Sequence, residues 1–439
     1  MRAGVSDNPP PAGDISRLAD RLFRQESGKL VSVLTRMFGI ERMQLAEDVV
    51  QEALIRAMQT WPYYGIPKNP AAWITQTAKH LALDVIRREK LFQDKQPGII
   101  DSLENWSPDS TPADTVRFES EIQDGRLRMM FACCHPSIPH DARVALALKL
   151  LCGFSTGEIA TAFLTSEAAI AKRLTRAKQR IRDAKIPFEI PVGEELSTRL
   201  DAVEQTLYLL FNEGYKASTG DSIIREELCS EAIALAELLA EHPVGNTPRA
   251  HALIALMMLN AARLPARVDA MGNVLRLSEQ NRSRWDRSLI ARGMSHFGQS
   301  IAGNKLTEYH VQAAITAYHC AAPDYESTDW TQILSLYDRL LEIDPSPVVE
   351  LNRAVALAKV SGPKAGIDAV MSIRDRAQLE SYYLFHAVLG EFEAQLENGE
   401  VAARHYEKAI ALTQVTSEQE FLSKRIAECE ALAGKGASV

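Results

Sequence analysis

Apolar residues recur three and four positions apart along most of the chain, which is the spacing of one face of an α-helix. Residues 15–60 are predicted to be helical throughout. Leu18, Leu34 and Met37 belong to the first apolar stripe, and Gly39 is predicted to be the C-cap of its helix. The pattern as a whole predicts an all-α fold.

A second helix is expected from about Met43 to Met58, ended by Trp61-Pro62. After a loop rich in Pro, Gly and aromatic residues, a third is expected from about Ala71 to Lys90. The inward faces are predicted to consist of Leu45, Val49, Ala53, Leu54 and Ala57 in the second helix and of Ile74, Ala78, Leu81 and Val85 in the third.

Two further helices are predicted at Arg126–Cys134 and Asp141–Leu151, and Asp141 is expected to be the N-cap of the latter. They precede the stretch GFSTGEIATAFLTSEAAIAKRLTRAKQRIR, residues 153–182. This stretch reads as a short helix, a tight turn and a second helix that becomes steadily more basic.

Within this stretch, Ser155 and Glu158 have the spacing of a capping box, and Ser166 follows the turn Leu164-Thr165 in position to cap the basic helix. The pattern is typical of a helix-turn-helix whose second helix enters the major groove of DNA. An ordinary helical hairpin with a solvated basic face is the alternative.

Residues 187–195 read as a linker, and helices continue to the end of the chain. One stretch fits the 34-residue tetratricopeptide repeat, in which small residues lie where two helices cross. The fitting positions are Leu389, Gly390, Ala402, Tyr406 and Ala409, with Tyr337 and Pro345 equivalent about two periods earlier. Residues 200–330 have helical stripes without a clear period.

Composition limits the class of protein. With 439 residues, 46% hydrophobic and 24% charged, the chain is expected to be globular, with roughly three domains. We find no apolar run long enough to cross a membrane and no signal peptide in residues 1–14, which read as a flexible tail. The six cysteines have no framework spacing, so reduced thiols in a cytoplasmic protein are expected.

The distribution of charge matters more than the total of −8. Residues 15–95 carry a net charge of +4, and residues 126–185 carry +7. The Pro-, Asp- and Ser-rich linker 96–125 between them carries −6, and residues 186–439 carry −12. Two basic blocks suited to phosphates are therefore separated by an acidic linker and followed by an acidic domain.

The second helix has an acidic patch, and the third a basic face with aromatic neighbours. The patch is either a solvated face or a docking surface for a basic partner. The aromatic residues Trp73, Tyr63 and Tyr64 beside cations would suit unstacked bases of a single strand. A core position for Trp73, with both tyrosines lining a loop, is the alternative.

Two other kinds of chemistry are disfavoured. Cys133-Cys134-His135 is poor geometry for tetrahedral zinc, and no second ligand pair has recognisable spacing. No nucleophile elbow, phosphate loop or metal pair marks an enzyme. Glu213 is expected to cap or brace a helix end rather than to act in catalysis. No cofactor is expected.

The motifs LAEDVVQEALIRAM and PAAWITQTAKHLALDVIRR resemble region 2 of extracytoplasmic-function (ECF) sigma factors. The stretch at 153–182 resembles their region 4. Later segments, among them LYLLFNEGYKAS and LSLYDRLLEIDP, resemble the long tetratricopeptide-like C-terminal extension of one sigma-factor group. The similarity extends over nearly all of the chain from residue 15.

The resemblance implies three sets of contacts. Core RNA polymerase, through its β′ clamp helices and with the β flap as a second contact, would bind Glu47, Asp48, Gln51 and Glu52. The −10 element would be bound by Lys68, Asn69, Trp73, Lys79, His80, Asp84, Arg87 and Arg88. The −35 element would be read by Ser166, Glu167, Ala168, Ala169, Lys172, Arg173 and Arg176, with Lys178, Arg180 and Arg182 holding phosphates.

One position departs from the family. Many such helix-turn-helix units have Gly in the turn where this chain has Leu164, which has a conformational cost if φ is positive. The start of the recognition helix is also small and weakly polar, so the −35 sequence is not readable from it.

The sequence thus predicts a promoter-specificity subunit of RNA polymerase, with no membrane partner. The expected parts are a tail (1–14), a region 2 domain (15–95), an acidic linker (96–125), a region 4 helix-turn-helix domain (126–186) and a helical extension (187–439). The extension is expected to regulate activity, through an intramolecular contact or a protein partner. A free-standing helix-turn-helix regulator and a tetratricopeptide adaptor that binds only protein are the alternatives.

Overall fold

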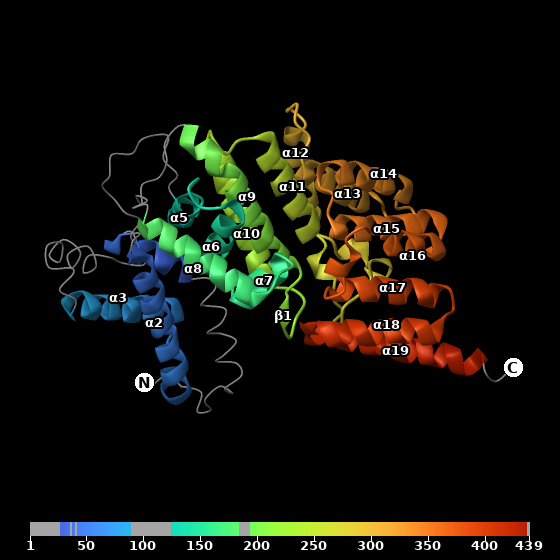
Figure 1. The fold of residues 1–439 in the computed structure, drawn as a ribbon, viewed down its shortest axis with the longest axis horizontal. Helices are drawn as coiled ribbons and strands as arrows, with labels where there is room; N and C mark the ends of the chain where they lie inside the picture. Colours follow the sequence, from blue (N-terminus) through green and yellow to red (C-terminus); the bar gives the residue numbers. More distant parts are fainter. Residues whose placement is uncertain (1–26, 36, 40–41, 89–123, 184–193, 437–439) are drawn as a thin grey trace, which may run out of the picture. The chain divides into compact units, whose positions relative to one another are not determined.

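The computed structural model describes residues 27–88 apart from 36, 40 and 41, then 124–183 and 194–436 (Figure 1). The expected N-terminal tail, the start of the first apolar stripe, nearly all of the acidic linker and most of the linker at 187–195 lie outside these residues. Helices make up almost all of the regular structure in the described part, so the prediction of an all-α fold is confirmed.

The described residues form two compact units, and the division falls within a single helix, α9 (Glu194–Tyr215). The first unit contains the described residues as far as Ala160 together with those between Thr165 and Thr206. The second contains the turn residues Thr161–Leu164 and the chain from Leu207 onward.

In the first unit, residues 27–35 and 37–38 are helical, and Gly39 ends this segment as predicted. Gly39 has a φ of +87°, and its N–H donates to the Thr35 carbonyl at 2.8 Å. The other described helices of the unit, before α9, are α2 (Met43–Tyr64), α3 (Pro70–Arg88), α5 (Gly125–Cys133), α6 (His140–Leu151), α7 (Thr156–Ala162) and α8 (Glu167–Asp183).

The prediction that Trp61-Pro62 ends the second helix is wrong, because α2 continues to Tyr64 with Pro62 inside it. Gly65, with a φ of +79°, is the C-cap and donates its N–H to the Trp61 carbonyl. Pro62 lies in the last turn, where a missing N–H removes a single hydrogen bond and little helix follows. The exposed tyrosines at 63 and 64 therefore belong to a helix and not to a loop.

The cores of α2 and α3 differ slightly from the predicted stripes. In α3, Ile86 is fully buried while Val85 is only half-buried, because the buried row runs through Ile74, Ala78 and Ala82 at steps of four residues. In α2, Leu45 is likewise half-buried. The other predicted inward residues of these two helices are buried.

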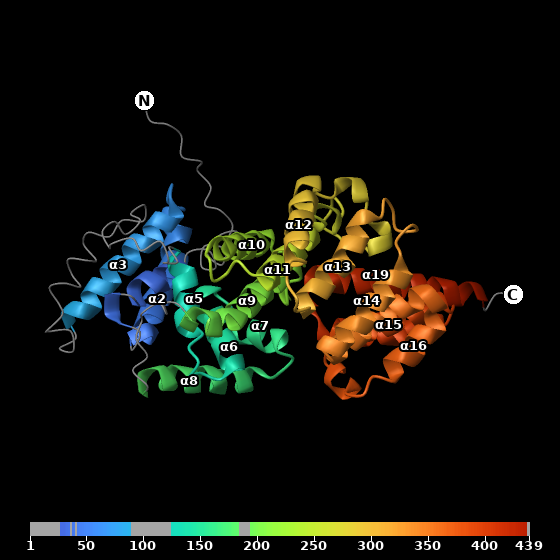
Figure 2. The same cartoon turned by 90° about the horizontal axis from the view of Figure 1, so that it is seen from above.

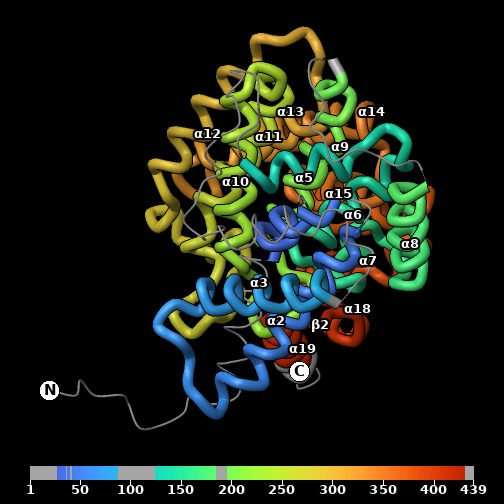
Figure 3. Tube along the Cα trace, turned by 90° about the vertical axis from the view of Figure 1, so that its left-hand side faces the viewer, coloured from blue at the N-terminus to red at the C-terminus, as the bar shows by residue number. Residues whose placement is uncertain are grey.

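The expected N-cap at Asp141 is also wrong. The N-cap of α6 is Pro139, and Asp141 lies within the first turn of the helix. The Asp141 carboxylate instead forms an ion pair with Arg173 of α8 at 3.1 Å. Helix α8 runs beside α6, as the two views of Figures 2 and 3 show.

The second unit is a succession of helices in which each packs on the next (Figure 1). They are α10 (Glu226–Glu241), α11 (Pro248–Ala261), α12 (Arg287–Ser300), α13 (Glu308–Ala321), α14 (Trp330–Ile343), α15 (Pro347–Ser361), α16 (Pro363–Met371), α17 (Tyr383–Gln395), α18 (Gly399–Leu412) and α19 (Thr416–Gly436). Short 3-10 helices at Leu264–Ala266, Leu277–Glu279, Arg282–Arg284 and Arg376–Leu379 lie between them.

The predicted repeat positions meet at the crossing of α17 and α18. Ala402, Tyr406 and Ala409 are buried on α18. A Cβ at Gly390 of α17 would lie 2.9 Å from the Tyr406 ring, so only glycine allows this approach. The spacing read from the sequence therefore marks a real helix–helix contact.

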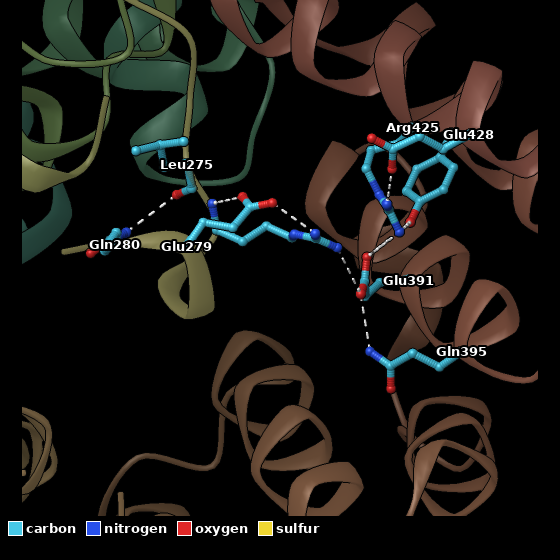
Figure 4. A network of polar contacts seen from close by, with 9 residues as sticks. Leu275, Glu279, Gln280, Glu391, Gln395, Arg425 and Glu428 are labelled. Atoms are coloured by element: carbon cyan, nitrogen blue, oxygen red, sulfur yellow. Dashed lines mark hydrogen bonds and ion pairs between the residues drawn. The ribbon is translucent and has the colours of Figure 1, made fainter. Parts of the chain in front are cut away.

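Two devices connect distant parts of the second unit. The two-residue strands β1 (Thr219–Gly220) and β2 (Gln414–Val415) pair in parallel. Farther on, Arg276 forms an ion pair with Glu391 at 3.6 Å, and Glu391 also accepts from Arg425 at 2.9 Å (Figure 4). Arg276, in the 3-10 region before α12, is therefore linked by an ion pair to α17 and, through Glu391, to Arg425 of α19.

The predicted brace at Glu213 is confirmed. Its buried carboxylate accepts the Ser218 N–H with both oxygens, at 3.1 and 3.2 Å, and forms an ion pair with Arg225 at 3.0 Å. Among the described residues, none of the helices has the length and apolar character needed to cross a membrane.

Candidate nucleic-acid interface

The helix-turn-helix is capped as the sequence predicts. Ser155 Oγ accepts the Glu158 N–H at 3.1 Å, and the Glu158 carboxylate accepts the Ser155 N–H at 2.7 Å, so the capping box at the start of α7 is closed. Ser166 Oγ accepts the Ala169 N–H at 3.3 Å and caps α8. Local sequence thus determines where both helices begin.

Leu164 forms the turn between α7 and α8 in a left-handed conformation, with a φ of +48°. The Thr165 N–H donates back to the Ala160 carbonyl at 2.9 Å and closes the turn. The side chain of Leu164 is 45% exposed. The turn therefore keeps the geometry that glycine would adopt more readily, and Leu164 buries only about half of its surface there.

Helix α8 buries one face and exposes another. Ile170, Leu174, Ala177 and Ile181 are buried. Of the ten predicted −35 residues, seven are exposed: Ser166, Glu167, Ala168, Lys172, Arg176, Arg180 and Arg182. Ala169, Arg173 and Lys178 are partly buried. The exposed set follows one side of the helix from its N-terminus to its end, as a helix lying in a groove of DNA requires.

Lys178 points away from this side. Its ammonium donates to Glu47 Oε2 and to Gln44 Oε1 of α2, both at 2.7 Å. The Lys178 and Glu47 side chains are only 17% and 9% exposed. Lys178 is therefore separated from Arg180 and Arg182, with which the sequence had grouped it.

The predicted polymerase-binding set on α2 does not lie on a single exposed face. Asp48 and Gln51 are exposed, and Glu52 forms an ion pair with Arg56 at 3.0 Å near the surface. Glu47 is buried, because it occupies the inward row of α2 with Ala46 and Val50. The acidic patch in the sequence therefore divides into a solvent-facing part and one inward carboxylate.

Two apolar residues on the exposed face of α2 were missed by the sequence reasoning. Ile55 is 48% exposed and Met58 is 51% exposed. They follow Asp48 and Gln51 at intervals of three, four and seven residues, so they extend the same face. That spacing is the signal that would have identified them.

Helix α3 presents most of the predicted −10 residues. Lys68, His80, Asp84 and Arg87 are exposed, and Lys79 is partly buried. His80 contacts Gln76, with 2.6 Å between their side-chain nitrogens. Arg88 is the last residue of the helix, and its side chain lies outside the description.

Asn69 starts α3 by accepting the Ala72 N–H on its side-chain oxygen at 3.0 Å. Trp73 is half-buried and meets the edge of the buried Trp61 ring, with 5.6 Å between ring centroids. Tyr63 and Tyr64 are 84% and 87% exposed at the end of α2. One indole anchored on the core and two exposed phenol rings thus lie near the start of the basic helix.

The cysteine pair lies in the core of the first unit. Cys133, Cys134 and Cys152 are buried cysteines. Burial raises the pKa of Cys134 to about 12, so the thiol stays protonated at neutral pH. Nearby, Arg199 of α9 is buried and donates to the Phe131 carbonyl of α5 at 2.9 Å.

Three parts of the chain match known protein families. Residues 22–92 match sigma-70 region 2, and residues 128–181 match sigma-70 region 4. Residues 199–301 match a family of unknown function, DUF6596. The first two matches include α2, α3 and the helix-turn-helix.

Individual relatives agree with these matches. The chain is 37% identical over 397 residues to an uncharacterized protein of Rhizobium meliloti, which is 90% of this chain and 92% of that protein. It is 27% identical over 165 residues to the ECF RNA polymerase sigma factor SigE of Mycolicibacterium smegmatis, covering 37% of this chain and 60% of SigE.

A third relative is the ECF RNA polymerase sigma factor SigL of Mycobacterium tuberculosis, 30% identical over 138 residues, which cover 31% of this chain and 72% of SigL. The order of the two sigma-70 regions in this chain agrees with that relationship. The chain therefore belongs to the ECF RNA polymerase sigma factors, which direct promoter recognition and transcription initiation.

Proposed function

We propose that the first unit divides the work of a sigma factor among the exposed faces of three helices. Helix α2 docks on core polymerase, α3 with its preceding loop binds the opened −10 strand, and α8 reads the −35 element. The observation that carries this proposal is the pairing of an acidic helix face and a basic, aromatic helix with a separately capped basic helix-turn-helix in one chain.

For polymerase docking, the proposal rests on Asp48, Gln51 and Glu52 with the apolar pair Ile55 and Met58. A strip of acidic and apolar side chains suits an amphipathic basic helix pair, because burial of apolar area supplies affinity while charge supplies orientation. The β′ clamp helices are the proposed partner of this strip, and the β flap is the proposed partner of the region 4 module.

For the −10 element, the tyrosines at 63 and 64 and Trp73 are proposed to stack on unpaired bases. Lys68 and Arg87 are proposed to hold the backbone of the same strand. Trp73 packs against the buried Trp61 in a T-shaped arrangement, so its ring is held in place and offers a rigid stacking surface at small entropic cost.

For the −35 element, residues 166–169 at the start of α8 are proposed to approach base edges, and Lys172 and Arg176 to follow them in the groove. Arg180 and Arg182 are proposed to hold phosphates. We expect Arg180→Ala to weaken binding of the polymerase complex to all −35 sequences about equally and to lower the salt slope by about 1. A change in sequence preference in a promoter-library assay would contradict the assignment of Arg180 to phosphates.

The docking assignment is tested by reversing two charges. Asp48→Lys with Glu52→Lys should lower affinity for core polymerase at least tenfold, measured by fluorescence anisotropy without DNA, because like charges would then meet. The matched control is Glu407→Lys with Glu420→Lys, two exposed carboxylates of the second unit. Equal losses in both double variants would show a general charge effect and contradict the docking face.

The second unit is proposed to regulate the sigma activity of the first. From Leu207 onward the chain carries a net charge of −8, and stacked helix pairs offer extended surfaces for peptides. A basic protein segment is therefore the proposed partner class. The proposal predicts that promoter-dependent transcription by reconstituted polymerase changes when the second unit is removed; an unchanged transcript level would contradict it.

A further inference from the structure

Lys178 and Glu47 contact each other in the first unit, although the family resemblance implied a DNA phosphate as the partner of Lys178 and core polymerase as the partner of Glu47. Lys178 belongs to the basic helix α8, and Glu47 to the acidic helix α2. Their side chains are 131 positions apart in sequence and 2.7 Å apart in space. Both are nearly excluded from solvent, so this ion pair is not screened as a surface pair would be.

The contact extends along the polymerase-facing side of α2. Gln44 accepts from Lys178 at 2.7 Å and donates its amide to Asp48 at 2.8 Å. The other carboxylate oxygen of Glu47 accepts from Gln51 at 3.4 Å. The Lys178 ammonium is thus connected by hydrogen bonds to three of the four residues assigned to polymerase. It contacts Glu47 directly, Asp48 through Gln44, and Gln51 through Glu47.

A second, independent contact joins the same two parts of the chain. The helix at 27–35 packs against α6, where a Cβ added to Gly28 would lie 2.2 Å from the Leu151 carbonyl oxygen. Beside this contact is a small hollow whose lining includes Ser27, Glu47 and Lys149. The ion pair therefore lies at the margin of a packed seam and is not an isolated surface contact.

We propose that this arrangement is a closed state, in which Lys178 holds region 4 against the docking helix and competes with core polymerase for it. The inference rests on the proposed docking role of α2. In the closed state Glu47 is neutralised internally, and the side chains of Asp48 and Gln51 are held by the same network. Polymerase binding releases Lys178, which then becomes available for a phosphate of the promoter.

The closed state can be observed in the full-length chain without polymerase. All six native cysteines are buried, so thiol-reactive dyes will label cysteines placed at the exposed positions Gln59→Cys on α2 and Thr175→Cys on α8. Energy transfer between the dyes should be high and narrowly distributed in the otherwise unchanged protein. It should fall and broaden when Lys178→Gln removes the ammonium, and it should also fall when core polymerase is added.

Competition is tested by affinity for core polymerase in the absence of DNA. Lys178→Gln should bind several-fold more tightly, because the cost of opening is removed. Gln44→Ala, which removes one of the two acceptors, should have a smaller effect in the same direction and serves as the second variant if Lys178→Gln folds poorly. Lys408→Gln removes an exposed lysine of the second unit and should change neither energy transfer nor affinity.

Unchanged energy transfer in both Lys178→Gln and Gln44→Ala would overturn the closed state. Reduced energy transfer with unchanged or weaker polymerase affinity would overturn the competition, and the docking face would still stand if the Asp48 and Glu52 reversal abolishes binding. If that reversal leaves binding intact while Lys178→Gln lowers energy transfer, the docking proposal fails, and the inference that depends on it fails with it.

Discussion

Leu164 holds a left-handed backbone conformation in the turn between the two helices of the DNA-binding module. An L-residue pays about 1–2 kcal/mol for this conformation, and the half-exposed side chain of Leu164 recovers only part of it through burial. The surrounding contacts hold the turn in this conformation. The caps at Ser155 and Ser166 determine where the two helices begin, and the Thr165 N–H donates to the Ala160 carbonyl. The turn is thus specified by its flanks.

We expect Leu164→Gly to be more stable than Leu164→Ala, because both variants lose the same leucyl group and only glycine relieves the left-handed conformation. That relief gains about 1–2 kcal/mol, and the greater freedom of glycine in the unfolded chain offsets about 0.5–1 kcal/mol of it. Glycine should therefore exceed alanine by about 0.5–1 kcal/mol in urea unfolding. Equal stability of the two variants would show that the left-handed turn stores no strain.

Single residues also show what could be predicted from the sequence. The capping box at Ser155 and Glu158 and the C-cap at Gly39 were predictable, because each depends on residues three or four positions apart. The inward position of Glu47 was not, because its partner Lys178 is 131 positions away. Asp141 was misassigned as an N-cap although it lies within the first turn of the helix, where one carboxylate oxygen accepts the Ala142 N–H at 3.0 Å and the other pairs with Arg173 of α8, a partner that local sequence does not reveal.

At the scale of elements, the helices of the site could be located from the 3.6-residue period, whereas their exposed faces could not be fully assigned. In α8 the buried residues Ile170, Leu174, Ala177 and Ile181 have helical spacing and leave the exposed basic side on the opposite face. In α2 the stripe was correct for most positions but did not show that an acidic residue joins the inward row. Pairing between helices, which the sequence pattern does not encode, decides such cases.

Helix α13 carries a histidine whose burial makes stability depend on pH. His319 is 9% exposed, and its ring meets the edge of Trp330 of α14. Burial, with Arg263 and Arg282 nearby, lowers the pKa of His319 to about 3. The folded chain therefore keeps the ring neutral. The unfolded chain takes up a proton below its ordinary pKa of about 6.5, so stability is lost as the pH falls from about 6.5 toward 3.

Between pH 7.5 and 5.5, His319 alone should lower the free energy of unfolding by about 1.4 kcal/mol. His319→Phe keeps an aromatic ring against Trp330 but cannot titrate, so its unfolding free energy should fall less with acid by about that amount. Urea unfolding at both pH values measures the difference. His80→Gln changes an exposed histidine and is the control. Parallel pH profiles for His319→Phe and the unchanged protein would contradict the assignment.

At the scale of the whole molecule, sequence motifs and physical units have different boundaries. The family match at 199–301 ends before α13, yet its Arg276 is fastened to Glu391 and through it to Arg425. The pairing of β1 with β2 connects the same segment to the chain before α19. The second unit therefore depends on contacts that the family boundary would cut.

Helix α9 gives the sharpest case, because its first half belongs to the first unit. Leu196, Leu200 and Val203 are buried there, and Arg199 donates to the Phe131 carbonyl of α5. A chain ending at residue 186, where the region 4 domain was predicted to stop, loses all four residues. A chain ending at residue 206 keeps them. We propose residue 206 as the functional end of the sigma module.

The two shortened chains should consequently behave differently. Loss of three buried aliphatic side chains at roughly 1.5–2 kcal/mol each should destabilise the 186-residue chain by about 5 kcal/mol relative to the 206-residue chain, visible as a large drop in thermal midpoint. Arg199→Ala in the full-length protein is an independent check, since it removes the α5 contact without shortening the chain. If the two shortened chains melt alike and transcribe alike, α9 is not part of the sigma module. If only the longer chain is folded, its transcription relative to the full-length protein measures the regulatory effect of the second unit without interference from damage to region 4.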